Sequence, residues 1–278
     1  QSLNPAFPMA RFINSLTQNR RNVTPGERRF AKRLETLLED DYLCWFDVPV
    51  GPARHYPDFL ILHPSRGLLL LEVKDWKLDI IRRLDKISAE ICVNGAVKTV
   101  ANPLEQARSY LNLVINTLSR DPQLCEPEGP YQGKIGFPYG YGVVLTNITR
   151  KQLDGALSEE EQSLVLPGRL VICQDEMTES VDAMDFQERL WGMFQYHFNR
   201  RLTLPQIERI RWHLFPEIRI GERQTTFFTE FEEKDGGRQD PESIPDLIRV
   251  LDLQQEQLAR SLGGGHRVIH GVAGSGKT

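Results

Sequence analysis

The apolar residues between positions 25 and 39 recur three and four residues apart, which is the spacing of one face of a helix. Thr24 can cap this helix, and Pro25 suits its first turn. The same reasoning predicts further helices over residues 103–118, 184–198 and 204–214. The apolar stripe of the first helix consists of Phe30, Ala31, Leu34, Leu37 and Leu38.

Shorter apolar runs bounded by turn residues predict strands. The leucines at positions 68–71 are apolar on both faces, so the strand over residues 67–73 is expected at the centre of a sheet. Asn94 and Gly95 predict the turn of a hairpin over residues 89–100. Strands mixed with helices predict an α/β sandwich. The other predicted strands cover residues 45–50, 56–62, 141–145 and 170–173.

The composition of the chain changes near residue 220. Residues 222–242 contain seven acids and three bases, a net charge of -4 that equals the formal charge of the whole chain. The rest of the chain therefore has no net formal charge. This acidic stretch lacks a core pattern and is predicted to be a linker over residues 221–242. It separates a first domain, residues 1–220, from residues 243–278, where a helix (247–262) and a short strand (267–270) are predicted.

Composition narrows the class of protein. No apolar run is long enough to cross a bilayer, and the first residues lack the layout of a signal peptide. The four cysteines are far apart and form no C-x-x-C pair, which argues against a zinc ribbon. We expect reduced cysteines, a cytoplasmic location and no membrane partner. Basic pairs such as Arg82 and Arg83 can contact phosphates, although solvated surface is the simpler interpretation of each.

The candidate chemistry lies in Asp58 and, after thirteen intervening residues, Glu72-Val73-Lys74. Glu72 and Lys74 point to the same side of a strand, and a tight turn can bring Asp58 beside them. Two neighbouring carboxylates in a buried place need a cation, and a divalent metal with oxygen ligands is the natural one. The carbonyl of Val73 is a further candidate ligand. The plainer alternative is an ion pair between Glu72 and Lys74 at a strand end.

These residues, with Gly26-Glu27 upstream and residues 102–106 (NPLEQ) downstream, resemble the nuclease-related (NERD) domain of the PD-(D/E)XK superfamily over roughly residues 20–150. The resemblance implies a restriction-endonuclease-like fold, a mixed central sheet flanked by helices, and Mg²⁺- or Mn²⁺-dependent cleavage of DNA. It also implies that Glu27 supports the metal, with Glu35 as a reserve. Glu27 falls within the apolar stripe of its helix, and its alternative role is that of an acid favoured by the helix dipole.

Gln106 and Tyr110 are four residues apart, like the Q-x-x-x-Y pattern of RecB-like nucleases. In that resemblance they contact the substrate or the attacking water. Gln106 lies nearly opposite the apolar stripe of its helix, which is compatible with facing the active site or with facing solvent. His55, which closely precedes Asp58, is interpreted as a surface or packing residue.

The last eight residues have the P-loop pattern G-x-x-x-x-G-K-T, which binds the phosphates of a nucleotide. With Gln255, or Gln257 as second choice, this segment resembles the start of a superfamily 1 helicase. The resemblance implies that ATP and the downstream helicase domain belong to a longer parent chain, and we expect no ATP hydrolysis by these 278 residues. The predicted phosphate-binding residues are Gly271, Gly274, Ser275, Gly276, Lys277 and Thr278.

Two functions of different classes follow from these patterns. The first is a metal-dependent DNA nuclease with Glu27, Asp58, Glu72 and Lys74 as its catalytic residues, which acts in DNA repair or in defence against foreign DNA. The alternative is a module of an NTP-driven helicase that binds DNA without cutting it. A homodimer is compatible with both, and no residue pattern demands it.

Overall fold

The computed structural model describes residues 10–12, 23–51, 53–196 and 200–215. The chain divides into two compact units, Gln1–Pro216 and Glu217–Thr278, and every described residue belongs to the first unit. The predicted linker, the helix over residues 247–262, the following strand and the P-loop therefore lie outside the described residues.

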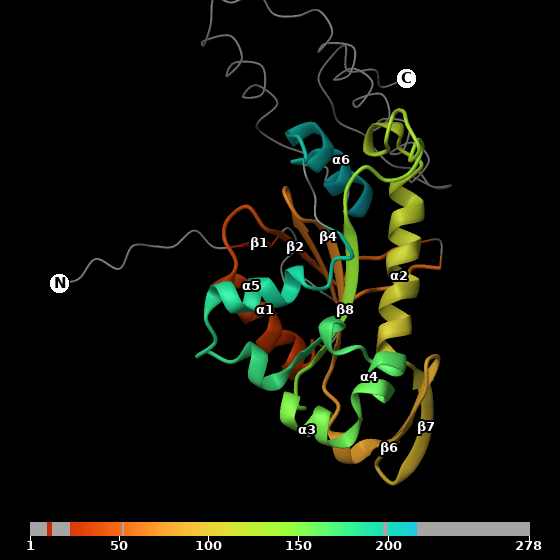
Figure 1. Cartoon of the computed structure of the whole chain (residues 1–278), viewed down its shortest axis with the longest axis vertical. Helices are drawn as coiled ribbons and strands as arrows, with labels where there is room; N and C mark the ends of the chain where they lie inside the picture. Colours follow the sequence, from red (N-terminus) through yellow and green to blue (C-terminus); the bar gives the residue numbers. More distant parts are fainter. Residues whose placement is uncertain (1–9, 13–22, 52, 197–199, 216–278) are drawn as a thin grey trace, which may run out of the picture. The chain divides into compact units, whose positions relative to one another are not determined.

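A six-stranded mixed sheet forms the centre of the first unit, with the strand order β1-β2-β3-β4-β8-β9 (Figure 1). Strands β2, β3 and β4 pair antiparallel, whereas β4, β8 and β9 pair parallel. This arrangement confirms the α/β class and is consistent with a restriction-endonuclease-like fold. The strands are β1 (Arg11–Phe12), β2 (Leu43–Phe46), β3 (Phe59–His63), β4 (Gly67–Lys74), β8 (Tyr139–Leu145) and β9 (Val171–Cys173).

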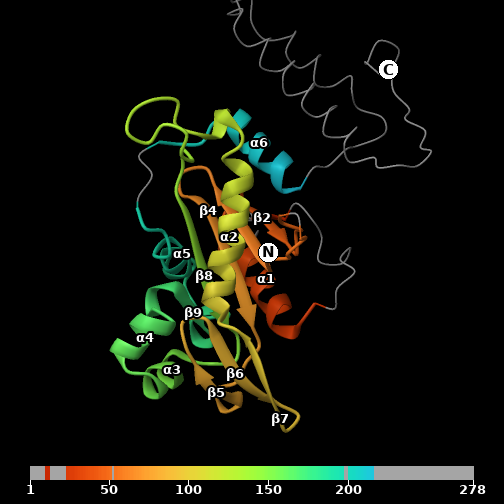
Figure 2. The ribbon, with the colours of Figure 1, turned by 90° about the vertical axis from the view of Figure 1, so that its right-hand side faces the viewer.

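Helices cover both faces of this sheet. Helix α2 lies along one face, and α1 and α5 lie on the other (Figure 2). No helix within the described ranges combines the length and the apolar character that a membrane span requires. The α-helices are α1 (Pro25–Leu37), α2 (Pro103–Leu118), α3 (Arg150–Ala156), α4 (Glu159–Val165), α5 (Ala183–Trp191) and α6 (Leu204–Leu214). The short 3₁₀ helices are η2 (Leu78–Ile80), η3 (Pro122–Leu124), η4 (Gly168–Leu170) and η5 (Gln174–Met177).

Strand β4 is buried on both sides, as the run of leucines predicts. Leu68 and Leu70 pack into the core beneath α2, while Leu69 and Leu71 pack into the core beneath α1 and α5. Each of these buried leucines contributes about 1.5–3 kcal/mol through loss of apolar surface to water. Because side chains alternate along a strand, Glu72 continues the row on the α2 side.

A second, three-stranded sheet is inserted between β4 and α2. Its β6–β7 hairpin turns at Asn94 and Gly95, which have φ angles of 53° and 78°, as the Asn-Gly signal predicts. The insertion leaves the main sheet directly after Lys74 and returns at Asn102, which caps α2. Its strands are β5 (Ile81–Leu84), β6 (Ser88–Val93) and β7 (Ala96–Ala101).

Several predicted boundaries are wrong. The strand predicted over residues 45–50 ends at Phe46, because Asp47 adopts a left-handed φ of 52° and turns the chain. The next strand begins at Phe59, so Asp58 precedes it. The helix predicted over residues 184–198 ends at Trp191, because Phe194 forms a β-bridge with Gly140. Strands β1 and β5 and helices α3 and α4 are too short to give a clear periodic pattern.

Candidate active site

The carboxyl end of β4 carries a buried acid beside a lysine. Glu72 is only 3% exposed, and the Lys74 ammonium lies 2.7 Å from Glu72 Oε1. The two side chains share the face of β4 that α2 covers, as residues two apart in a strand do. The ion pair that the sequence left as an alternative therefore exists, and it is part of a larger group of polar contacts.

Asp58 directly precedes β3 and faces the end of β4 that carries Glu72 and Lys74. Its Oδ2 accepts a hydrogen bond of 2.7 Å from the amide of Val73. Burial raises the pKa of Asp58 well above its usual value, and the negative charge of Glu72 raises it further. The Val73 amide and the Lys74 ammonium oppose these effects. Asp58 and Glu72 are therefore close enough to repel each other, as the predicted strand–turn–strand requires.

Helix α2 contributes the next contacts. The side-chain amide of Gln106 donates 2.7 Å to Glu72 Oε1, while its carbonyl accepts from Lys74 Nζ at 3.2 Å. The same Gln106 nitrogen donates to the hydroxyl of Tyr110 at 3.2 Å. Gln106 thus faces the carboxylates rather than solvent. The structure brings both residues of the Q-x-x-x-Y pattern to the site, and their contact with substrate stays a prediction.

Helix α1 begins beside this group. Its Glu27 forms a capping box with Thr24, whose amide donates to Glu27 Oε2 at 2.9 Å. The charge of Glu27 is also among the influences that raise the pKa of Asp58, so Glu27 lies near the acid pair. The charge of the reserve acid, Glu35, instead helps to raise the pKa of Cys44 in β2. A metal-supporting role for Glu27 stays a prediction.

A clamp centred on Asp75 holds three element ends together, and sequence reasoning missed it. Asp75 Oδ2 accepts from the amide of Gly26 at 2.9 Å, and its other oxygen accepts from the hydroxyl of Thr146. The Thr146 amide donates to the carbonyl of Lys74 at 3.1 Å. Asn147 donates to the backbone carbonyl of Asp75 at 2.9 Å. The acid directly after Glu72-Val73-Lys74 was the available signal for this clamp.

The donor set fits a hard divalent cation. The buried carboxyl group of Glu72 and the partly buried one of Asp58 lie beside one ammonium, and Mg²⁺ is commonly held by one or two carboxylates plus water. Among the described residues, no group of three or more His, Cys, Asp or Glu side chains could hold a metal ion. A cation here would therefore be held by Asp58 and Glu72, with water or a backbone carbonyl such as that of Val73 completing its shell.

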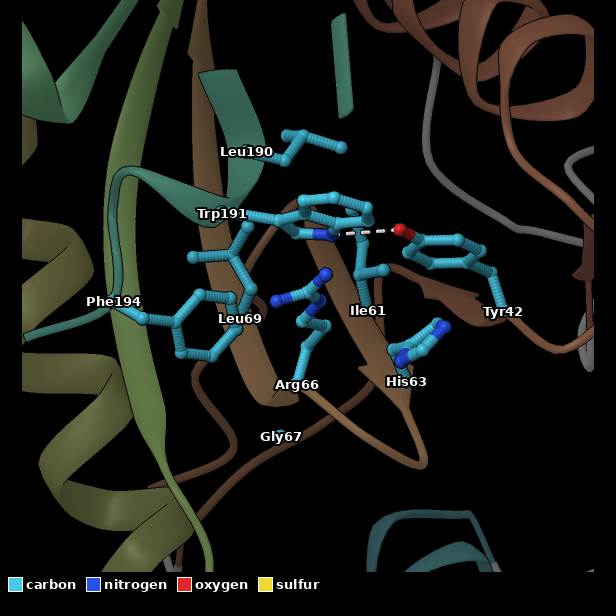
Figure 3. Close-up of a pocket in the computed structure, with 9 residues that line it drawn as sticks. All are labelled: Tyr42, Ile61, His63, Arg66, Gly67, Leu69, Leu190, Trp191 and Phe194. Carbon is cyan, nitrogen blue, oxygen red and sulfur yellow. Dashed lines mark hydrogen bonds between the residues drawn. The ribbon is translucent and has the colours of Figure 1, made fainter. Parts of the chain in front are cut away.

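An aromatic pocket lies at the other end of β3 and β4 (Figure 3). Its polar groups contact one another: the Trp191 indole donates 2.7 Å to the Tyr42 hydroxyl, and the Arg66 guanidinium lies 3.7 Å from the Trp191 ring centroid. His63 contacts Asp41 at 3.0 Å. Gly67, which lines the pocket, is the first residue of β4, whereas Lys74 is the last. We therefore interpret the pocket as a packing contact between α5 and the sheet rather than as the catalytic site.

Comparison with known families finds a similarity for part of this chain. Residues 22–138 match the family model described as the nuclease-related domain, NERD. The match runs from the residues before α1 to those before β8 and includes Glu27, Asp58, Glu72, Lys74 and Gln106. The segment over residues 22–138 is therefore similar to a nuclease-related domain. Searches of curated proteins and of solved structures returned no match.

Proposed function

We propose that this chain hydrolyses phosphodiester bonds in DNA and requires Mg²⁺ or Mn²⁺. The observation that carries the proposal is the convergence of Asp58, Glu72, Lys74 and Gln106 at the end of β4, within a segment similar to a nuclease-related domain. A divalent cation held by the two carboxylates would supply positive charge that polarises the phosphoryl group.

The residues of the chain then have separable roles. The Lys74 ammonium, fixed between Glu72 and Gln106, is placed to orient the attacking water or to stabilise charge that develops on the phosphate. Gln106 holds both partners of this pair in position. Asp58 is held by the Val73 amide so that its carboxylate faces Glu72 across the β3–β4 pair.

The biological setting is part of the proposal. The P-loop pattern of residues 271–278 supports a parent chain in which this domain works beside a helicase that uses ATP, in DNA repair or in defence against foreign DNA. DNA and the helicase domain are then its partners, and the cytoplasm is its location. These P-loop residues, with Gln255, lie outside the described residues.

The second candidate function is binding of DNA without cleavage. Two observations favour it: Lys74 already neutralises Glu72 at 2.7 Å, and no third acid joins the pair as a ligand within the described ranges. In this case the site holds a DNA strand and passes it to the motor domain.

Cleavage assays separate the two functions. Supercoiled plasmid and labelled linear DNA are incubated with the chain in Mg²⁺, Mn²⁺ or EDTA, and Asp58→Asn and Lys74→Ala are compared with Asp40→Asn and Lys151→Ala, which replace exposed residues. We expect metal-dependent cutting that only the first two substitutions abolish. Binding of DNA without cutting in any metal would instead establish the non-cleaving module.

A further inference from the structure

The loop between β2 and β3 folds back on itself just before Asp58. Val50 and His55 exchange two backbone hydrogen bonds, of 2.7 and 3.0 Å, that close it. Asp47 and Arg54 adopt left-handed φ angles of 52° and 53°, which residues with a Cβ atom rarely do. Such conformations persist where the surroundings fix them, and they cluster at functional sites.

This loop sets His55 against Tyr110 of α2. Their ring centroids are 5.2 Å apart, with 31° between the ring planes. His55 is exposed, so a planar group arriving from solvent can reach its ring, whereas Tyr110 is partly buried. A histidine that served only the core would be covered by its neighbours. The tilted pair therefore has the form of an aromatic surface that faces outward.

The pair is connected to the candidate active site by two hydrogen bonds. The Tyr110 hydroxyl accepts from Gln106 at 3.2 Å, and the same Gln106 nitrogen donates to Glu72 at 2.7 Å. Arg54, the residue that precedes His55 in the sequence, is exposed and carries a guanidinium group. An aromatic pair is thus joined through Gln106 to the carboxylate of Glu72.

We propose that His55 and Tyr110 form a stacking platform for an unpaired base next to the scissile phosphate, and that Arg54 contacts a neighbouring phosphate. The proposal rests on the proposed function, since it takes DNA as the substrate, and it specifies the class as single-stranded or frayed DNA. Every base offers a π face, so the platform gives affinity without sequence preference. A base inside a duplex is stacked on its neighbours and cannot reach His55.

Binding without cleavage tests the platform. Fluorescence anisotropy in Ca²⁺ measures the Kd of the whole chain for a labelled oligothymidylate, and we compare His55→Ala, His55→Phe and His55→Gln. Loss of base stacking weakens binding by roughly 5- to 150-fold. We expect this loss in His55→Ala and His55→Gln but not in His55→Phe, which keeps a ring. Retained affinity in His55→Gln with loss in His55→Phe would overturn stacking in favour of a polar contact.

A second series uses abasic positions to locate the contact. Removing one base at a time should weaken wild-type binding at a single position, and His55→Ala should be insensitive at that same position. Arg54→Ala should reduce the salt dependence of binding, whereas Arg120→Ala, which replaces an exposed arginine at the end of α2, should not. Equal sensitivity of wild type and His55→Ala to every abasic position would overturn the platform.

Parallel assays keep the two proposals distinguishable. If wild type binds the oligonucleotide in a His55-dependent manner but does not cut it in Mg²⁺, the nuclease proposal fails and the platform stands. If wild type cuts DNA and His55→Ala binds and cuts as well as wild type, the platform fails alone. Blunt duplex DNA should show little difference between wild type and His55→Ala, and a large difference there would contradict the preference for unpaired bases.

Discussion

Glycine at position 26 allows helix α1 to begin in contact with the end of β4. A Cβ atom at this position would lie 1.6 Å from Asp75 Oδ1 and 2.5 Å from Thr146 Oγ1, inside the clamp that joins α1, β4 and β8. The residue after Gly26 is Glu27, so the glycine also determines how closely that acid approaches Asp58. This gives a physical reason for the Gly-Glu pair.

The substitution Gly26→Ala should disturb both stability and the site. We expect the free energy of unfolding to fall by about 1–3 kcal/mol, the usual cost of forcing extra volume into a packed place. Cleavage should fall with it, because Asp75 must leave the Gly26 amide. Urea denaturation and plasmid nicking measure the two effects.

A matched glycine serves as the control. Gly155 lies in α3, and a Cβ atom there would meet nothing within 4 Å. Gly155→Ala should therefore increase stability by about 0.5–1 kcal/mol, since alanine is the better helix former. If the free energy of unfolding changed no more in Gly26→Ala than in Gly155→Ala, the result would contradict the clamp.

Asp58 should be a source of instability in the metal-free protein. Its pKa is raised in the folded state by burial and by the Glu72 charge, so its favourable contribution is complete below the unfolded pKa and is lost as pH rises through the folded pKa. In EDTA at pH 7, Asp58→Asn should raise the free energy of unfolding by about 1–3 kcal/mol. Denaturation from pH 4 to pH 8 measures this gain, which should shrink toward acid pH. A gain that does not vary with pH would show that the charge is not responsible.

At the scale of elements, α6 is attached to the rest of the first unit by an ion pair between the buried Asp121 and the partly buried Arg209. Asp121, which caps η3, accepts from Arg209 at 2.7 and 2.9 Å and contacts His213 at 2.9 Å. Burial raises the pKa of Asp121, but the hydrogen bonds from His213 and Arg209 outweigh it and leave the pKa below its usual value. The carboxylate therefore stabilises α6 while it is charged.

Breaking this attachment should be costly at neutral pH. Asp121→Asn removes one partner of a buried pair and should lower the free energy of unfolding by about 3–5 kcal/mol. Because the folded pKa is depressed, the wild-type advantage is present above the unfolded pKa and is lost as pH falls through the folded value. Thermal melts at pH 7 and at acid pH measure it. Glu208→Gln, in an exposed pair on the same helix, should change stability by less than about 1 kcal/mol.

The elements that the sequence predicts well are those whose signals are local. The cap and first turn of α2 lie within a few residues of each other, and so do the two turn residues of the β6–β7 hairpin. The loop before Asp58 gives no such signal, because Asp47 and Arg54 are not residues that usually adopt a positive φ. Its shape depends on contacts with the folded sheet and on the closure between Val50 and His55.

The same distinction applies to the site. Asp58, Glu72 and Lys74 are predictable together, because strand alternation and a short turn fix their geometry. The Asp75 clamp joins residues up to 72 positions apart, and the contact of His55 with Tyr110 joins two separate segments. A single sequence carries no information about such pairs until the sheet order is known.

At the scale of the whole molecule, the folding unit is larger than the segment that matches the nuclease-related family. That segment ends at residue 138, yet β8 begins at Tyr139 and pairs with β4 along its length. The core beneath α1 also includes Phe186 and Leu190 of α5. Without these parts, β4 would have an open edge next to the candidate catalytic residues, and an apolar face of the sheet would be exposed.

Two shortened chains test this view. A chain that ends at residue 138 should aggregate or show no cooperative melt, because an uncovered central strand is a template for association. A chain that ends at Pro216 keeps the first compact unit, so it should melt within a few degrees of the full chain and cut DNA with the same metal dependence. Circular dichroism and plasmid nicking measure both properties. If the longer of these chains folds normally but no longer cuts, residues 217–278 take part in catalysis, and the site at the end of β4 is not sufficient.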